Sequence, residues 1–209
     1  ADADADDTGE PSDSGGPDSP IEEDAVVMYG DYKIENSVDL EFLTGYTAIA
    51  GDLEIDAGPL PSIASLSELT RVSGNLKISS NYGLTTLDGL EGLTEVGGDL
   101  SISNNDGLVS CSLDNLTEVG DDLWVYDNDA LTSVDGFASL TAVGGNLQIA
   151  NNNALTNLDG LESLTDVGAD ISILSNTTLC QSLVYAFLDM MTSLGWSGSV
   201  GAITSNADC

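Results

Sequence analysis

The chain offers many carboxylates and few of the other groups that catalysis uses. Of its 209 residues, 36 are Asp or Glu, three are Lys or Arg and none is His. Without His, a Cys–His nucleophile cannot be assembled. Lyases and hydrolases that act on polysaccharides gather carboxylates and basic residues in one cleft, whereas these acids are spread along the chain. The sequence therefore predicts a protein that is not an enzyme, with no catalytic residue and no dedicated metal site.

The charge balance also limits the partners. The formal net charge is -33, and nucleic acids and anionic membranes are bound by Lys and Arg. No apolar run approaches the roughly 20 residues that cross a bilayer. We therefore expect no nucleic-acid partner and no membrane insertion, and an acidic surface that stays well hydrated.

Residues 1–27 are predicted to form a separate segment. The first 24 residues hold ten acids and no base, with Pro, Gly and Ser between them, which is typical of a disordered tether. Asp2, Asp4 and Asp6 alternate as in a calcium loop, but Asp7 and Asp13 stand where an EF-hand needs Gly and Glu. We expect no cofactor here beyond loose Ca²⁺ binding by acidic residues of the tail or turns.

A repeat organises residues 28–209. The pattern Gly-x-Leu-x-Ile restarts in steps of 21 to 24 residues, as at Gly74-Asn75-Leu76-Lys77-Ile78. Its alternation indicates a short strand with one buried face, and the apolar residues that follow recur every three positions, as in a short-strand or 3₁₀ wall. Such a repeat predicts a solenoid. We expect an all-β, right-handed parallel β-helix of about seven coils.

Two polar rows recur with the repeat. An Asn follows each strand by three residues, and we expect a buried ladder that joins successive coils: Asn81, Asn105, Asn128, Asn152 and Asn176. A Thr row forms a second register: Thr70, Thr94, Thr117, Thr141 and Thr165. Asp-Gly pairs at 88–89, 135–136 and 159–160 indicate tight turns in which Gly supplies a positive φ. Because these rows occur in every coil, they are interpreted as structural.

Departures from the repeat are more informative. Cys111 takes a position that is apolar in other coils and is predicted to be a buried thiol. Apolar residues at helical spacing predict an amphipathic α-helix at about residues 181–194, followed by Gly195, that caps the open end of the solenoid. Cys180 and Cys209 fall on neighbouring coils, so we predict a disulfide that closes this cap in an oxidising compartment.

The repeat Gly-Asn-Leu-x-Ile-x-x-Asn-x-x-Leu-x-x-Leu-x-Gly-Leu-x-x-Leu-Thr-x-Val-Gly resembles the receptor L-domain family, leucine-rich β-helical modules of receptor ectodomains and bacterial surface proteins. The resemblance covers about residues 28–209. It implies recognition of a protein or glycan through a sheet face, without an enzymatic site. The tail is similar to the spacers of bacterial surface lipoproteins, which implies an extracellular location and a lipid anchor.

Alternation also identifies the residues that face outward from the strands. Trp124 and Tyr126 stand on one strand, with Leu174 two coils further on, and aromatic residues are enriched at binding hot spots. These three are the predicted partner-binding residues. A second candidate surface lies at the turns, at Tyr82, Asp106, Asp127 and Asp129. We expect a surface recognition or adhesion module; the alternative is a structural subunit of a surface layer or filament, with the tail bridging copies.

Overall fold

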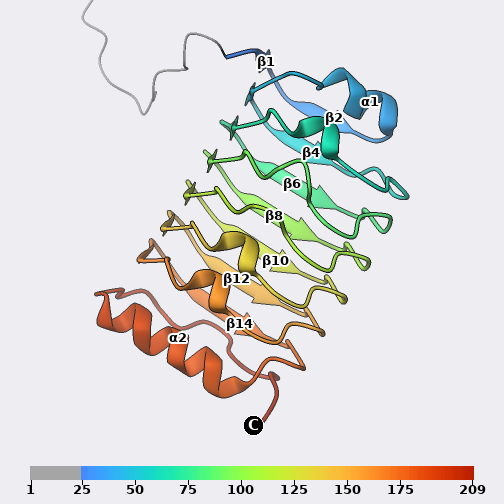
Figure 1. Cartoon of the computed structure of the whole chain (residues 1–209). Coiled ribbons are helices and arrows are strands. Elements are labelled where there is room, and N and C mark those ends of the chain that lie inside the picture. Colours follow the sequence, from blue (N-terminus) through green and yellow to red (C-terminus); the bar gives the residue numbers. More distant parts are fainter. Residues whose placement is uncertain (1–24) are drawn as a thin grey trace, which may run out of the picture.

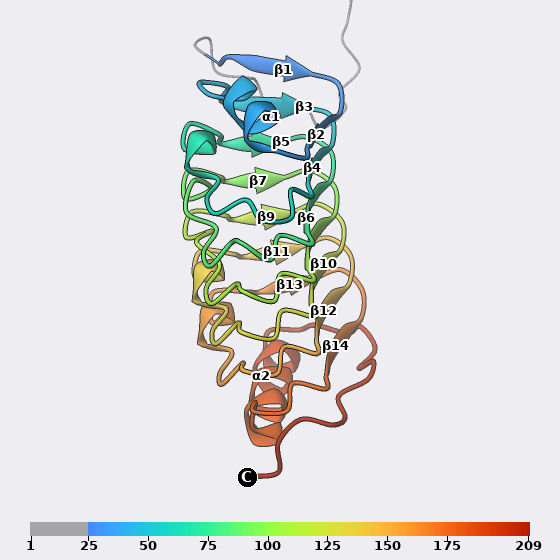
Figure 2. The ribbon, with the colours of Figure 1, turned by 90° about the vertical axis from the view of Figure 1, so that its right-hand side faces the viewer.

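The computed structural model describes residues 25–209, which form a solenoid of two parallel β-sheets joined by loops (Figure 1). Each sheet has seven strands, and each coil of chain contributes one strand to each sheet. Seen from the side, the strands stack in regular rungs (Figure 2). The prediction of a mostly β, parallel solenoid is confirmed. The predicted acidic tether lies almost wholly in residues 1–24, outside the described part, and stays a prediction.

We call the two layers sheet A and sheet B. Sheet A consists of β1 (Val27–Tyr29), β3 (Ala48–Ala50), β5 (Arg71–Val72), β7 (Glu95–Val96), β9 (Glu118–Val119), β11 (Ala142–Val143) and β13 (Asp166–Val167). Sheet B consists of β2 (Tyr32–Ile34), β4 (Leu53–Ile55), β6 (Leu76–Ser79), β8 (Leu100–Ser103), β10 (Leu123–Tyr126), β12 (Leu147–Ala150) and β14 (Ile171–Leu174). The helices are α1 (Ser37–Phe42), α2 (Gln181–Ser193) and the 3₁₀ turns η1 (Ala64–Leu66), η2 (Asp135–Phe137) and η3 (Asp159–Leu161).

The core runs the length of the solenoid between the sheets and the return loops. In β6, Leu76 and Ile78 are fully buried, while Lys77 between them is exposed. The return loop that follows buries an apolar residue at every third position, at Leu84, Leu87, Leu90 and Leu93. One coil cannot cover these faces alone, so the core forms only when neighbouring coils stack.

The predicted Asn ladder is present in the core. All five Asn residues are completely buried. The Asn81 backbone N–H donates to Asn105 Oδ1 at 2.9 Å, and Asn81 Nδ2 donates to the Ile55 carbonyl of the preceding coil at 2.9 Å. The same bonds recur at each later Asn, and Asn206 Oδ1 extends the ladder by accepting from Asn176 N–H. Each Asn thus satisfies backbone groups that would otherwise be buried without partners.

Two outer ladders run parallel to the buried one. An Asp or Asn precedes the first inward residue of every sheet B strand, and its side chain accepts the backbone N–H of the same position in the next coil: Asp31, Asp52, Asn75, Asp99, Asp122, Asn146 and Asp170. In the Thr row, each Oγ1 donates to the Thr carbonyl of the preceding coil, as from Thr94 to Thr70 at 3.0 Å. This Asp/Asn ladder was not predicted, although an Asp or Asn stands at this position in every coil of the sequence.

The prediction of positive φ at the Asp-Gly pairs is correct for one of three. Gly89 has a φ of 116°, but Gly136 and Gly160 do not lie in the positive region. These two belong to 3₁₀ turns, and a Cβ at either would overlap a carbonyl of the preceding coil, that of Cys111 or Val134. They are glycines because the coils approach closely, not because the turn needs a left-handed residue.

The N-terminal end carries a helix that the sequence analysis missed. Asn36 caps α1, and its Oδ1 accepts the backbone N–H groups of Val38 and Asp39. Asp39 Oδ2 accepts in return from Glu35 N–H at 2.9 Å. This reciprocal arrangement resembles a capping box, and α1 buries Leu40 against the first coil.

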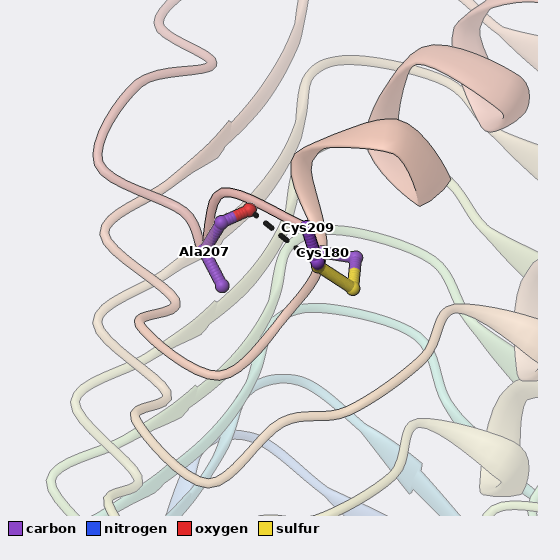
Figure 3. Close-up of a disulfide and its surroundings, with 3 residues drawn as sticks. All are labelled: Cys180, Ala207 and Cys209. Atoms are coloured by element: carbon purple, nitrogen blue, oxygen red, sulfur yellow. Dashed lines mark hydrogen bonds between the residues drawn. A yellow bond between two sulfur atoms is a disulfide. The ribbon is translucent and has the colours of Figure 1, made fainter.

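The C-terminal end is closed by α2 and the segment after it (Figure 1). The helix buries one face against the last coil, through Val184, Phe187, Leu188 and Met191. The chain then returns along β14, where the Ser175 N–H donates to the Thr204 carbonyl at 2.8 Å. A disulfide joins Cys180 to Cys209 (Figure 3), as predicted.

Candidate functional site: the outer face of sheet B

The outer side of sheet B changes character along the solenoid. On β8, β10, β12 and β14, none of the eight outward side chains carries a charge: Ser101, Ser103, Trp124, Tyr126, Gln148, Ala150, Ser172 and Leu174. We call this set the uncharged face. In a chain with 36 acidic residues, a charge-free patch across four neighbouring strands is unusual, and interface centres are depleted of charge.

Trp124 and Tyr126 lie at the centre of the uncharged face. In the β-ladder, Trp124 stands between Ser101 and Gln148, and Tyr126 between Ser103 and Ala150. Both aromatic side chains are half-buried. The small residues beside Tyr126 are almost inaccessible, with exposed fractions of 1% for Ser103 and 4% for Ala150. The aromatic rings are therefore flanked, on the adjacent strands, by small residues that solvent hardly reaches.

Leu174 shares this face but not the immediate contact. It lies on β14, paired in register with Ala150, so one strand separates it from Tyr126. Its side chain is half-buried. The structure thus places all three predicted residues on one side of sheet B, with the aromatic pair adjacent and Leu174 at the C-terminal margin.

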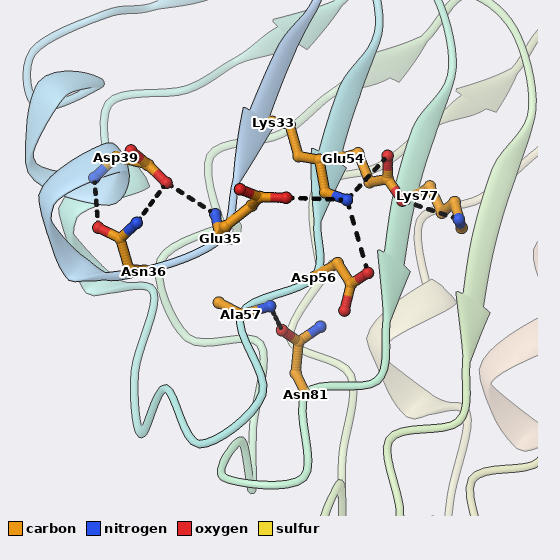
Figure 4. Close-up of polar contacts among 9 residues, drawn as sticks. All are labelled: Lys33, Glu35, Asn36, Asp39, Glu54, Asp56, Ala57, Lys77 and Asn81. Carbon is orange, nitrogen blue, oxygen red and sulfur yellow. Dashed lines mark hydrogen bonds and ion pairs between the residues drawn. The ribbon is translucent and has the colours of Figure 1, made fainter.

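The N-terminal part of the same side is charged. Lys77 Nζ donates to Glu54 Oε1 at 2.8 Å, and Lys33 Nζ lies 3.2 Å from Glu35 Oε1 and 3.7 Å from Asp56 Oδ2 (Figure 4). The hydrogen bond from Lys77 holds the pKa of Glu54 below its usual range, and the charges of Lys77 and Lys33 act in the same direction against partial burial. This network bounds the uncharged face on one side.

Sheet A shows the contrasting pattern. Its outward residues include Arg71, Glu95, Glu118 and Asp166. Arg71 Nη2 donates to Glu95 Oε1 at 3.0 Å. The absence of charge is therefore a property of the C-terminal half of sheet B and not of the repeat.

The second candidate surface at the turns is a row of polar residues. Asp106, Asp127 and Asp129 line a shallow groove together with Asn151 and Asn153. The groove is internally bonded, since Asn151 Nδ2 donates to Asp127 Oδ1 at 2.8 Å and Asn153 Nδ2 to Asp129 Oδ1 at 2.6 Å. Within residues 25–209, no group of three His, Cys, Asp or Glu residues is placed to hold a metal ion.

Tyr82 belongs to the same row of turns but lies outside that groove. The residue is 64% exposed, and its ring stands over Gly58 of the preceding coil. Cys111, the remaining thiol, is buried as predicted, and burial raises its pKa to about 12. A thiol with this pKa stays protonated at neutral pH and is a poor nucleophile.

Comparison with known families is informative for the second half of the chain. The Receptor L domain family model matches residues 94–190. This segment is therefore similar to receptor L domains, in agreement with the resemblance of the repeat. It spans β7 to α2 and therefore includes the strands of the uncharged face. No curated protein matches the chain. Neither α-helix of residues 25–209 has the length and hydropathy of a membrane span.

Proposed function

We propose that the chain is an extracellular, non-catalytic recognition module that binds a partner protein through the uncharged face. Trp124 and Tyr126 act as the anchors at its centre, and Leu174 extends the contact toward the C-terminal end. The location rests on the Cys180–Cys209 disulfide, because disulfides persist in oxidising compartments. Attachment to a bacterial surface through the acidic tail is part of the same proposal.

The observation that carries this proposal is the lack of charge around the aromatic pair. Burying a charge against a partner costs several kcal/mol unless it is paired, so a face without charges can be covered at low cost. Trp and Tyr add large contact areas with few rotatable bonds. The Lys33–Glu54–Lys77 network at the margin would then form part of a polar rim.

A flat face suits a protein better than a small ligand. Small molecules bind in concave sites that enclose most of their surface, and the groove at the turns and the hollow between α2 and η3 are both lined by residues other than Trp124 and Tyr126. A glycan stacked on the two rings is the competing ligand class. Assembly of identical copies into a layer or filament is the competing function.

The test begins with a screen of the full chain against arrays of cell-surface proteins and glycans. Each hit is then measured with a Trp124→Ala/Tyr126→Ala variant and with Tyr185→Ala, which removes an exposed ring from α2. We expect the double variant to weaken binding by at least roughly 30-fold, equivalent to about 2 kcal/mol, and the control to bind normally. Equal binding by the double variant and the wild type would refute the site.

Two further results would change the proposal. If the chain binds only glycans, and the Trp124→Ala/Tyr126→Ala variant does not bind them, the site would stand but its ligand would be a glycan. Sedimentation velocity that shows concentration-dependent polymers of the wild-type chain, with and without Ca²⁺, would favour the structural subunit.

A further inference from the structure

An apolar groove lies between α2 and η3, away from the uncharged face. It has a volume of about 180 Å³, and its apolar lining consists of Leu158, Leu161, Leu183, Ala186, Phe187 and Met190. An apolar cavity of about 150 Å³ holds a benzene ring. The groove is therefore large enough for one aromatic or branched side chain from outside.

Helix α2 is apolar over a wider arc than its packing on the core requires. Val184, Leu188 and Met191 are buried against the last coil. Leu183, Ala186 and Met190 follow a second stripe at i, i+3 and i+7 and line the groove, and Leu183 is 39% exposed. A helix whose single role was to cover the core would carry polar residues on that stripe.

The rim of the groove is acidic. Asp159 and Glu162 stand beside the apolar lining, and none of the ion pairs formed within residues 25–209 includes either carboxylate. From residue 78 to the C-terminus the sequence contains no Lys or Arg. The C-terminal half of the solenoid therefore offers no basic residue that could pair with Asp159 or Glu162.

A second copy of this chain does not suit the groove. All three basic residues, Lys33, Arg71 and Lys77, lie in the first coils and are already within 4 Å of acidic partners. A copy with a net charge of -33 would also be repelled by the acidic rim. Charge complementarity thus favours a different partner.

We propose that this groove binds a cationic amphipathic segment of another protein. One apolar side chain of that segment occupies the hollow between Leu161 and Phe187. Lys or Arg residues on its flanks face Asp159 and Glu162. This is helix-in-groove recognition, with a buried anchor for affinity and opposite charges for orientation and association rate. Met190 suits such a site, because its flexible side chain adapts to the shape of the anchor.

The test uses the full chain and a fluorescent 18-residue peptide of Leu and Lys at helical spacing, followed by fluorescence anisotropy. Ala186→Trp fills the hollow from an exposed helix position and should weaken binding roughly tenfold or more. Asp159→Asn with Glu162→Gln should weaken it by about fivefold at low salt, with a smaller effect at high salt.

Two controls separate the groove from general attraction to an acidic surface. Glu118→Gln with Asp166→Asn removes the same charge from sheet A and should change affinity by less than about twofold. A peptide with Ser in place of Leu should bind at least roughly tenfold more weakly. Circular dichroism and the urea midpoint of each variant verify that it folds.

Three results would overturn the proposal. The first is unchanged affinity in Ala186→Trp. The second is an equal loss in the sheet A control. The third is a dimer of the wild-type chain that Ala186→Trp abolishes, which would assign the groove to a second copy.

Discussion

Replacing Asn128 with Ala tests whether the buried ladder stabilises the solenoid. Asn128 is completely buried. Its Oδ1 accepts the Asn105 backbone N–H at 3.1 Å, and its Nδ2 donates to the Ile102 carbonyl at 2.9 Å. The substitution removes these two bonds, so the buried Asn105 N–H and Ile102 carbonyl each lose a partner. It also removes bonds to Asn105 Nδ2 and the Tyr126 carbonyl, which keep other partners. At about 1–3 kcal/mol for each unsatisfied group, we expect a loss of roughly 2–6 kcal/mol in the free energy of unfolding.

The assay is urea unfolding followed by tryptophan fluorescence and circular dichroism. A total stability of about 5–15 kcal/mol is usual for a domain, so the variant should have a much lower midpoint or be unfolded in buffer. The matched control is Asn153→Ala, since Asn153 is exposed and bonds to Asp129 on the surface. It should change the free energy of unfolding by about 0.5 kcal/mol or less. A cost below about 1 kcal/mol for Asn128→Ala would refute the view that the ladder satisfies the buried backbone.

Three other substitutions or treatments have defined outcomes. Gly136→Ala brings a Cβ onto the Cys111 carbonyl and should cost about 2 kcal/mol or more in the urea assay. Gly92→Ala, whose Cβ would lie 3.3 Å from the Leu69 and Ser67 carbonyl oxygens, should cost less; equal costs would contradict the close-approach explanation. Burial raises the pKa of the Cys111 thiol to about 12, so as pH rises this thiol ionises in the unfolded chain before it does in the folded chain. The free energy of unfolding should therefore fall by up to about 1.4 kcal/mol per pH unit above about pH 9. Cys111→Ala should remove this slope; the same pH profile in the variant and the wild type would refute the role of Cys111. Reducing the Cys180–Cys209 bond opens a loop with a sequence separation of 29 and should cost about 3.5 kcal/mol in the loop-entropy model; thermal unfolding that is insensitive to reductant would contradict this.

Much of the fold follows from the sequence because the repeat encodes it several times. The alternation at Leu76 and Ile78 and the Asn row specify which face is buried, and a shift of one residue would expose every core side chain. The Cys180–Cys209 disulfide could be predicted because the repeat assigns each cysteine to a coil and to a position within that coil. Such predictions are reliable because the local sequence pattern and the overall fold favour the same structure.

The parts that were missed depend on contacts between coils. The difference between Gly89 and Gly136 cannot be found in the Asp-Gly dipeptide: a Cβ at either would overlap a carbonyl of the preceding coil, but only Gly89 has a positive φ. Helix α1 was missed although Asn36 and Asp39 form a recognisable capping pair. The groove beside α2 could not be predicted, since it arises where a helix meets the 3₁₀ turn of an earlier coil.

The candidate site was partly predictable. Alternation identified Trp124 and Tyr126 as outward-facing, and the structure places them together. The other outward positions around them also follow from alternation, and the pairing of the four strands confirms that they share one face. Their role in binding stays a prediction.

The position of α2 has a consequence for how this molecule can vary. The ladder spacing is 23 or 24 residues between Asn81 and Asn176, but 30 residues separate Asn176 from Asn206. The helix is thus inserted inside a coil whose ladder nevertheless resumes. Return loops can therefore accept extra segments without disturbing strand pairing, whereas a single-residue deletion within a sheet B strand would shift its register. Duplication or loss of whole coils, and replacement of the inserted segment, are the changes through which such a protein can acquire new specificities while its scaffold stays constant.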